Sequence, residues 1–260
     1  MIKDNIKFEL DKGYIKKSPV NNGASLEIAS SISAYSLAKR SGLFSVPEVL
    51  EFDLEANEIV FEYIQNISPV GSLLHHLGDE KLAEIFFRVG QILRYIHLSL
   101  EPDCGRYLIP KSIDFEGWKT FLHGDFNLIN VQYDLLRDHI VILDWSLTPL
   151  LKKSANWGTH FWDIAWMINS IFCSPPYLTN DYLYRKMLAE SFLLGYQQNS
   201  SNVIDKKAFS LYCQNVFELF LKKFQQRTDF LHQIVQLPNR FMFEKFSLSL
   251  GKEVNSLLCK

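Results

Sequence analysis

The stretch FLHGDFNLINVQYDLLRDHIVILDW, residues 121–145, restricts the local fold more than any other part of this 260-residue chain. Its second half holds two strand-like runs, NVQYD and HIVILDW, on either side of a polar turn at 135–138, a pattern that predicts a β-hairpin. A hairpin brings its two ends together, so Asn130 at one end and Asp144 at the other should converge. Asp125, five residues before Asn130, should lie beside them.

These three predicted neighbours have the chemistry of a phosphoryl-transfer site. The side-chain oxygens of Asn130 and Asp144 are donors of the kind that Mg²⁺ takes when water and substrate phosphates supply its other ligands. Asp125 is then left to accept a proton from an attacking hydroxyl. Phosphoryl transfer needs little more, because positioning and charge neutralisation provide most of the catalysis.

The chain before this stretch has the pattern of a small β-rich unit. Four short strands are expected, with tight turns in each pair, at 6–10, 13–18, 46–53 and 58–64. Between the two pairs a helix is expected, with Ser25 as its N-cap, an end near Arg40 and a stop at Gly42.

The chain after residue 72 is mainly helical in its pattern. From Asp79, apolar residues recur at helical spacing over about twenty residues. Further helices are expected at 161–172, 180–198, 206–226 and 229–250. We therefore expect an α+β fold with a β-rich unit at 1–64, a linker at 65–72, and a helical unit at 73–260 that contains the hairpin.

His123-Gly124-Asp125, Asn130 and the run Ile142-Leu143-Asp144-Trp145 together resemble the signature of the aminoglycoside phosphotransferase/choline kinase-like small-molecule kinases. The resemblance implies a two-lobed protein kinase-like fold with a short β-rich N-lobe and a mainly helical C-lobe. It implies ATP or GTP as co-substrate, Asp125 as the catalytic base, and Asn130 and Asp144 as ligands of Mg²⁺. His123 would support the loop backbone, and Asp163 would help to hold that loop.

The same resemblance assigns the nucleotide-binding residues of the N-lobe. Residues 61–64 would form the hinge, where the backbone at Glu62 and Ile64 binds adenine. Lys16 would neutralise phosphate charge and be oriented by Glu27. Lys17 is the near alternative, because strand alternation aims neighbouring side chains at opposite faces. Only fifteen residues precede Lys16, and one glycine among them leaves open how the triphosphate is covered.

Composition and charge limit the kinds of partner that this chain is expected to bind. The formal net charge is −2 and no Lys/Arg block exceeds two residues, so neither nucleic acid nor an anionic membrane is an expected partner. The amino terminus lacks a secretory pattern, and the four cysteines lack metal-ligand spacing, so we expect a cytoplasmic protein with reduced thiols. Residues 175–260 carry 11 Lys/Arg against 7 Asp/Glu, which disfavours a polycationic acceptor. The expected partners are a nucleotide and a small hydroxyl-bearing metabolite.

A second interpretation is a non-catalytic nucleotide-binding or scaffold protein on the same fold. The short front unit and the lack of a glycine-rich loop favour it. The complete set of Asp125, Asn130 and Asp144 disfavours it, because a chain released from catalysis has little reason to keep all three.

Overall fold

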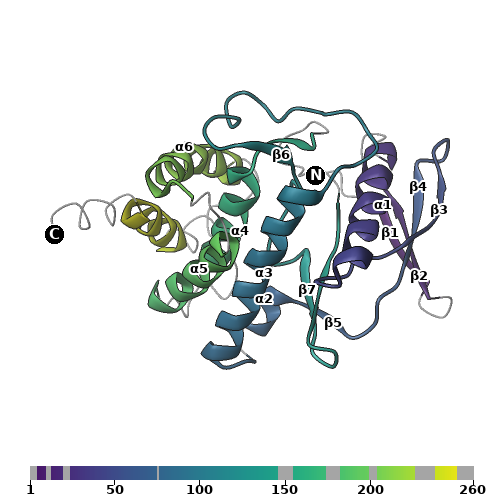
Figure 1. Cartoon of the computed structure of the whole chain (residues 1–260), viewed down its shortest axis with the longest axis horizontal. Coiled ribbons are helices and arrows are strands. Elements are labelled where there is room, and N and C mark those ends of the chain that lie inside the picture. The colour runs from purple at the N-terminus through teal and green to yellow at the C-terminus, as the bar shows by residue number, and fades with distance from the viewer. Residues whose placement is uncertain are drawn as a thin grey trace.

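The computed structural model describes residues 5–9, 13–19, 24–74, 76–145, 155–173, 182–198, 204–225 and 238–250. It has a β-rich lobe and a helical lobe, as the sequence predicts (Figure 1). The elements run β1 (Asn5–Glu9), β2 (Tyr14–Ser18), α1 (Ala24–Ser41), β3 (Val49–Asp53), β4 (Glu58–Glu62), β5 (Ile67–Pro69), α2 (Val70–Leu73), α3 (Asp79–Ser99), β6 (Lys119–Phe121), β7 (Val131–Asp134), β8 (His139–Ile142), β9 (Trp157–Thr159), α4 (Phe161–Cys173), α5 (Tyr182–Gln197) and α6 (Lys206–Gln225).

The N-lobe is an antiparallel sheet in the order β1-β2-β4-β3, with α1 packed against one face. On that face Ala24 and Ile28 of α1 contact Ile59 of β4. The helix ends close to where the sequence predicts: Gly42 has a φ of 64°, and its N–H donates to the Ala38 carbonyl at 2.9 Å. A glycine in this left-handed conformation is a common end for a helix.

The C-lobe is built around α3, whose apolar side is buried and whose neighbour along its length is α5 (Figure 1). The two helices pack closely at two glycines. A Cβ on Gly90 would lie 2.1 Å from the Phe192 carbonyl oxygen, and one on Gly195 would lie 1.9 Å from that of Phe87. Any larger residue at either position would push the helices apart.

The predicted hairpin is formed by β7 and β8 and lies between the two lobes in Figure 1. Its third strand is β5, which pairs with β7. Residues 65–72, expected to form a linker, therefore contain β5 and the start of α2. A second small sheet, formed by β6 and β9, was not expected. Because β6 precedes the catalytic loop and β9 precedes α4, this pairing brings the start of the loop close to the start of α4.

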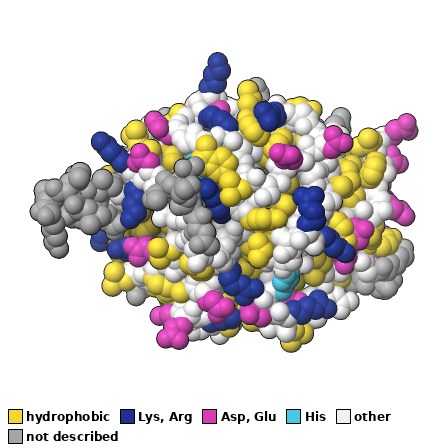
Figure 2. Space-filling model, viewed as in Figure 1, with side chains coloured by type: hydrophobic (Ala, Val, Ile, Leu, Met, Phe, Trp, Pro, Cys, Tyr) yellow, Lys and Arg dark blue, Asp and Glu magenta, His cyan; other side chains and the backbone are white. Residues whose placement is uncertain are grey.

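The remaining helices lie close to their expected positions, with α4 to α6 followed by a helical stretch at 238–250. The first part of the helix expected at 229–250 and the turn residues Asp11-Lys12 lie outside the described residues. Among the described helices, none combines the length and apolar character needed to cross a membrane. Figure 2 shows Lys/Arg and Asp/Glu side chains interspersed over the visible face.

Candidate active site

The loop that carries Asp125 follows β6 and is held by hydrogen bonds to Asp163 of α4. The two carboxylate oxygens of Asp163 accept the backbone N–H groups of His123 at 2.8 Å and Gly124 at 2.9 Å. His97, near the end of α3, lies 3.1 Å from the same carboxylate through its Nε2. Asp163 is fully buried, so these bonds satisfy polar atoms that would otherwise be costly to bury. The family resemblance implies this supporting role for Asp163.

His123 supports the loop through its ring. Its Nε2 lies 3.0 Å from the carbonyl of Leu143, and its Nδ1 accepts the backbone N–H of Asp125 at 3.3 Å. Burial lowers the pKa of His123, so the ring is neutral at physiological pH. A neutral imidazole with both ring nitrogens bonded fixes the loop next to Leu143, which follows β8 and precedes Asp144. This agrees with the expected supporting role.

The Asp125 carboxylate is surrounded by hydrogen-bond donors. Oδ1 accepts the indole N–H of Trp166 at 2.7 Å and the amide of Asn127 at 2.9 Å, while Oδ2 accepts the amide of Asn130 at 3.0 Å. Even so, burial, reinforced by the negative charge of Asp144, raises the pKa of Asp125 to about 6. A carboxylate with a raised pKa that is still mostly ionised at pH 7 suits a general base.

Asn130 and Asp144 converge as the hairpin predicts. The N–H of Leu143 donates to the carbonyl of Asn130 at 2.9 Å, directly after the pairing of Val131 with Ile142. Asp144 follows with a φ of 57°, a left-handed conformation that is uncommon outside glycine and is a marker of functional sites.

The side-chain oxygens here suit a hard cation. The Nδ2 of Asn130 donates to Asp125, so its Oδ1 is the atom left for a ligand. Asp144 is about one-third exposed, and its carboxylate, which contacts Lys17, is the second oxygen donor. One amide and one carboxylate are too few to coordinate a metal ion by protein ligands alone. Among the described residues, no group of three or more His, Cys, Asp or Glu side chains is placed to hold a metal ion. The set fits Mg²⁺ that brings water and phosphate oxygens with it.

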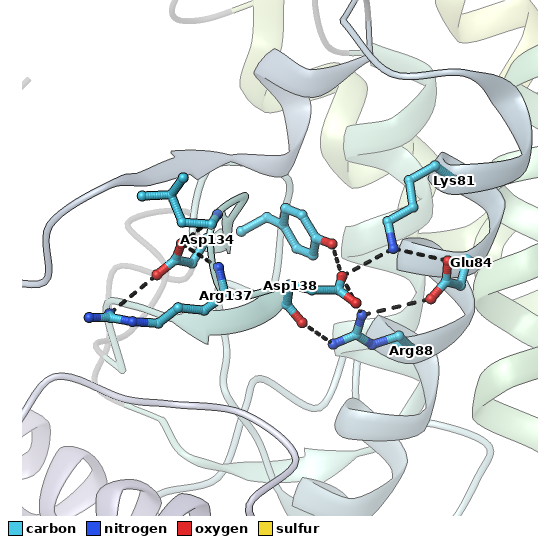
Figure 3. A network of polar contacts seen from close by, with 8 residues as sticks. Lys81, Glu84, Arg88, Asp134, Arg137 and Asp138 are labelled. Atoms are coloured by element: carbon cyan, nitrogen blue, oxygen red, sulfur yellow. Dashed lines mark hydrogen bonds and ion pairs between the residues drawn. The ribbon is translucent and has the colours of Figure 1, made fainter.

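The outer end of the hairpin is fixed to α3 by a charged cluster (Figure 3). The Asp138 carboxylate accepts from Lys81 at 3.1 Å, from Arg88 at 2.9 Å and from the hydroxyl of Tyr133. Arg88 also donates to the backbone carbonyl of Asp138 at 2.8 Å. Asp134 caps the same turn, because its Oδ1 accepts the N–H groups of Leu136 and Arg137. The strands that place Asn130 and Asp144 are therefore tied to the helical lobe.

The structure reverses the expected pairing of the two lysines. Lys17 is buried, and its Nζ lies 2.6 Å from Glu27 and 2.6 Å from Asp144. Lys16 lies on the opposite face of β2 and pairs instead with Glu58 at 2.5 Å. The expectation that Glu27 orients Lys16 is therefore wrong. Strand alternation predicts that only one of the two lysines faces the cleft, but the sequence does not say which one.

The face of the sheet that carries Lys17 also carries exposed apolar side chains. Directly opposed residues share a face, so Ile6, which pairs with Lys17, and Phe8, which pairs with Ile15, lie on this face. Ile6 is 48% and Phe8 is 62% exposed. Because α1 covers the β4 side of this face, the β1 side is an uncovered apolar surface beside Lys17. Sequence reasoning missed this surface, although the alternation of β1 could have indicated it.

The expected hinge follows β4. The N–H of Glu62 donates to the carbonyl of Glu48, and the N–H of Tyr63 donates to the carbonyl of Gly13. Within the described part of the chain, no such backbone bond involves Ile64. Glu62 and Ile64 line a cavity of about 440 Å³, and none of Lys17, Asp125, Asn130 or Asp144 is among its lining residues.

Comparison with known proteins identifies the fold. No protein-family model matches the sequence, and no curated protein sequence matches it. Solved structures do match. Choline kinase LicA from Streptococcus pneumoniae aligns with a TM-score of 0.54 and 18% identity, over 95% of this chain and 89% of that one. A choline/ethanolamine kinase family protein from Mesorhizobium loti gives 0.57 and 13%, over 97% and 90%.

Other structures of the same fold carry small-molecule substrates. A glucosamine kinase in complex with glucosamine, ADP and inorganic phosphate aligns with a TM-score of 0.56 and 12% identity, over 98% of this chain and 81% of that one. The gentamicin complex of the aminoglycoside phosphotransferase APH(2″)-IIa gives 0.51 and 15%, over 90% and 87%. The chain thus has the two-lobed protein kinase-like fold of the choline kinases and aminoglycoside phosphotransferases, as the sequence predicts.

Proposed function

We propose that this chain is a small-molecule kinase that transfers the terminal phosphoryl group of ATP or GTP to a hydroxyl. The observation that carries the proposal is the convergence of Lys17, Asp125 and Asp144 from three separate segments of the chain. Lys17 and Asp144 are in direct contact, and the charge of Asp144 reaches the carboxylate of Asp125. A cation, a metal-binding carboxylate and a base within one cleft are the components that phosphoryl transfer uses.

In this mechanism each residue has one task. Lys17, oriented by Glu27, contacts the phosphates; it replaces Lys16 in the expected role. The uncovered apolar face beside Lys17 and the backbone near Ile64 receive the base. Asn130 and Asp144 would hold Mg²⁺, which would supply positive charge to offset that of the phosphates. Asp125 orients the acceptor hydroxyl and takes its proton as the new oxygen–phosphorus bond forms.

The structural neighbours suggest a set of acceptor compounds to test. Their names include choline, ethanolamine, glucosamine, gentamicin and streptomycin as substrates or ligands. All are hydroxyl-bearing small molecules with an amine or ammonium group. A panel of these five compounds, with ATP and GTP in turn, is the first screen for nucleotide consumption.

Asp125→Asn tests the mechanism. The variant keeps the size of the side chain but removes the base, so turnover should fall by on the order of 10²–10⁴-fold. Stabilisation of the protein by Mg-nucleotide should persist, because Lys17, Asn130 and Asp144 remain. Asp103→Asn is the matched control, since it makes the same change at an exposed position outside the site. Undiminished transfer by Asp125→Asn would disprove the assignment of the base.

One observation favours the second candidate, a non-catalytic nucleotide-binding protein. Gly13 directly precedes β2, and its carbonyl accepts the N–H of Tyr63 at the hinge. Lys17 lies four residues further along the chain, roughly 13 Å away at the rise of a strand. Gly13 is therefore too far from Lys17 to cover phosphates that Lys17 holds. Nucleotide binding without consumption across the acceptor panel would favour this candidate.

A further inference from the structure

One side of α4 lies along the catalytic loop and donates to it through two tryptophans. The indole N–H of Trp162 donates to the carbonyl of Gly124 at 2.8 Å, and that of Trp166 donates to Oδ1 of Asp125 at 2.7 Å. Residues four apart lie on the same side of a helix. The two indoles are stacked with centroids 6.1 Å apart and planes 5° from parallel, so each limits the movement of the other.

The donors around Asp125 make its two oxygens unequal. Oδ1 accepts two hydrogen bonds, from Trp166 and Asn127, while Oδ2 accepts one, from Asn130. A carboxylate offers about two lone-pair positions on each oxygen. Oδ1 is therefore filled within the protein, and Oδ2 keeps one position for a substrate group.

We propose that Trp166 is a positioning residue that fixes the Asp125 carboxylate so that Oδ2, and not Oδ1, receives the proton of the acceptor hydroxyl. The inference rests on the proposed kinase function. In the step itself, the acceptor oxygen bonds to the γ-phosphorus while its proton passes to Oδ2. The bond from the γ-phosphorus to the bridging oxygen breaks, and its electron pair leaves with the nucleoside diphosphate.

The indole is suited to this task by its chemistry. Its N–H donates and cannot accept, so it cannot exchange roles with the substrate hydroxyl as a side-chain hydroxyl could. Trp166 is only partly exposed and is stacked on the fully buried Trp162, so its bond to the carboxylate is shielded from water. The amide of Asn127 sits on the loop itself, whereas Trp166 ties the carboxylate to a helix.

The kinetic test replaces the indole with a ring that lacks a donor. In Trp166→Phe, kcat should fall about tenfold or more, because the base is no longer held in one orientation. The KM for the nucleotide should stay within about twofold, because the substitution does not alter the contacts that bind the nucleotide equally in the ground state and the transition state. The acceptor is the compound from the five-member panel that gives the fastest turnover, or water if none does. Trp157→Phe is the matched control, as Trp157 is also partly exposed but lies on β9, and it should keep the wild-type rate.

A second measurement tests the contact without turnover. The chain has five tryptophans, so ¹⁵N-labelled protein should give five indole N–H cross-peaks, and the peak lost in Trp166→Phe assigns one of them. Asp125→Asn removes the charge that this N–H faces. The Trp166 peak should then move further than those of the other four indoles.

Three outcomes are distinguishable. A reduced kcat in Trp166→Phe with a displaced peak in Asp125→Asn supports the inference. An active wild type with equal kcat in Trp166→Phe, or an unmoved Trp166 peak in Asp125→Asn, overturns the inference while leaving the kinase function intact. A wild type inactive with every panel compound and with water overturns the proposed function, and the catalytic role of Trp166 with it.

Discussion

Lys17 connects the two lobes at the level of single residues. It is 6% exposed and lies between Glu27 of α1 and Asp144 at the end of the hairpin. Glu27 is itself 2% exposed, so the contact with Lys17 at 2.6 Å offsets part of the cost of burying its charge. Removing one member of a buried ion pair is costly because the other charge stays buried. Lys16 and Glu58, by contrast, are each about one-third exposed, and water screens their interaction.

Lys17→Met should therefore destabilise the protein, and Lys16→Met should not do so to a similar extent. We expect Lys17→Met to lower the free energy of unfolding by about 3–5 kcal/mol, measured by urea denaturation. Nucleotide turnover should be lost in the same variant and kept in Lys16→Met, its matched control. Adding Glu27→Gln to Lys17→Met should recover part of the stability, because the buried carboxylate that lost its contact with Lys17 is then neutral. Equal effects of the two single lysine variants would contradict the assignment of Lys17.

The raised pKa of Asp125 gives a pH dependence with a definite sign. The folded-state pKa of about 6 exceeds the unfolded value of about 3.9, so between these values the folded protein binds more protons. The contribution of Asp125 to stability is then greatest at low pH and falls as the pH rises through 6. A difference of about two units corresponds to on the order of 3 kcal/mol at most.

This dependence is measured as the difference in free energy of unfolding between the wild type and Asp125→Asn. The difference should become less favourable to the wild type between pH 4 and pH 7. Turnover should change in the opposite direction, falling as the pH drops below about 6, because a base must be deprotonated. A stability difference that is flat across this range would show that the Asp125 pKa is not raised.

At the scale of elements, the β7–β8 hairpin depends on anchors at both ends. Its inner end is held by the contacts around Asp144, and its outer end by Asp138 and the two cations of α3. Helix α4 supplies the complementary support: besides its two indoles, Ser170 accepts the N–H of Leu128 at 3.2 Å. The catalytic loop is thus fixed between a helix face and a hairpin, which is how irregular backbone can keep a defined geometry.

Asp138→Asn tests the outer anchor. Asp138 has a φ of 51°, which asparagine tolerates, so this substitution removes the charge without straining the backbone. Because the cluster is exposed, the expected loss of stability is only about 1 kcal/mol, and it should shrink in 1 M NaCl as the ion pairs are screened.

Asp138→Ala should lose roughly 1–2 kcal/mol more, because alanine is disfavoured in the left-handed conformation. Urea denaturation at low and high salt measures both variants, with Asp103→Asn as the control. A loss that does not depend on salt would show that the cluster does not act through its charge.

At the scale of the molecule, backbone hydrogen bonds and an ion pair join the two lobes. The backbone of Ser45, between α1 and β3, exchanges hydrogen bonds of 2.9 Å with Ile140 and Ile142 of β8. The ion pair of Lys17 with Asp144 bridges the lobes at the cleft. A nucleotide held by both lobes would add contacts that only the folded arrangement offers, and would stabilise the whole protein.

We therefore expect ATP or GTP with Mg²⁺ to raise the Tm. At a ligand concentration a hundred times Kd the gain is about 2.7 kcal/mol, which a thermal-shift titration detects readily. The gain should be smaller without Mg²⁺, and in Asp144→Asn the difference between the two conditions should disappear. If nucleotide stabilises the wild type equally with and without Mg²⁺, the roles proposed for Asn130 and Asp144 are contradicted.

The sequence by itself determined the features that depend on short separations along the chain. The hairpin follows from strand pattern and turn chemistry within fifteen residues. It places the backbone of Asn130 against that of Leu143, the residue before Asp144, in line with the predicted convergence of Asn130 and Asp144. The stop at Gly42 and the buried side of α3 are equally local. The two-lobed α+β fold followed from the order of these patterns and from the resemblance of one loop to a known family.

Only the tertiary structure decided which side chains meet across long separations. Alternation shows that Lys16 and Lys17 face opposite ways, but the packing of α1 on one face of the sheet selects Lys17. Trp166 reaches Asp125 from 41 residues away, and nothing in its local sequence separates it from a core aromatic residue. Such contacts depend on how complete elements pack, because burial and shape complementarity act between surfaces and leave no periodic pattern in the chain.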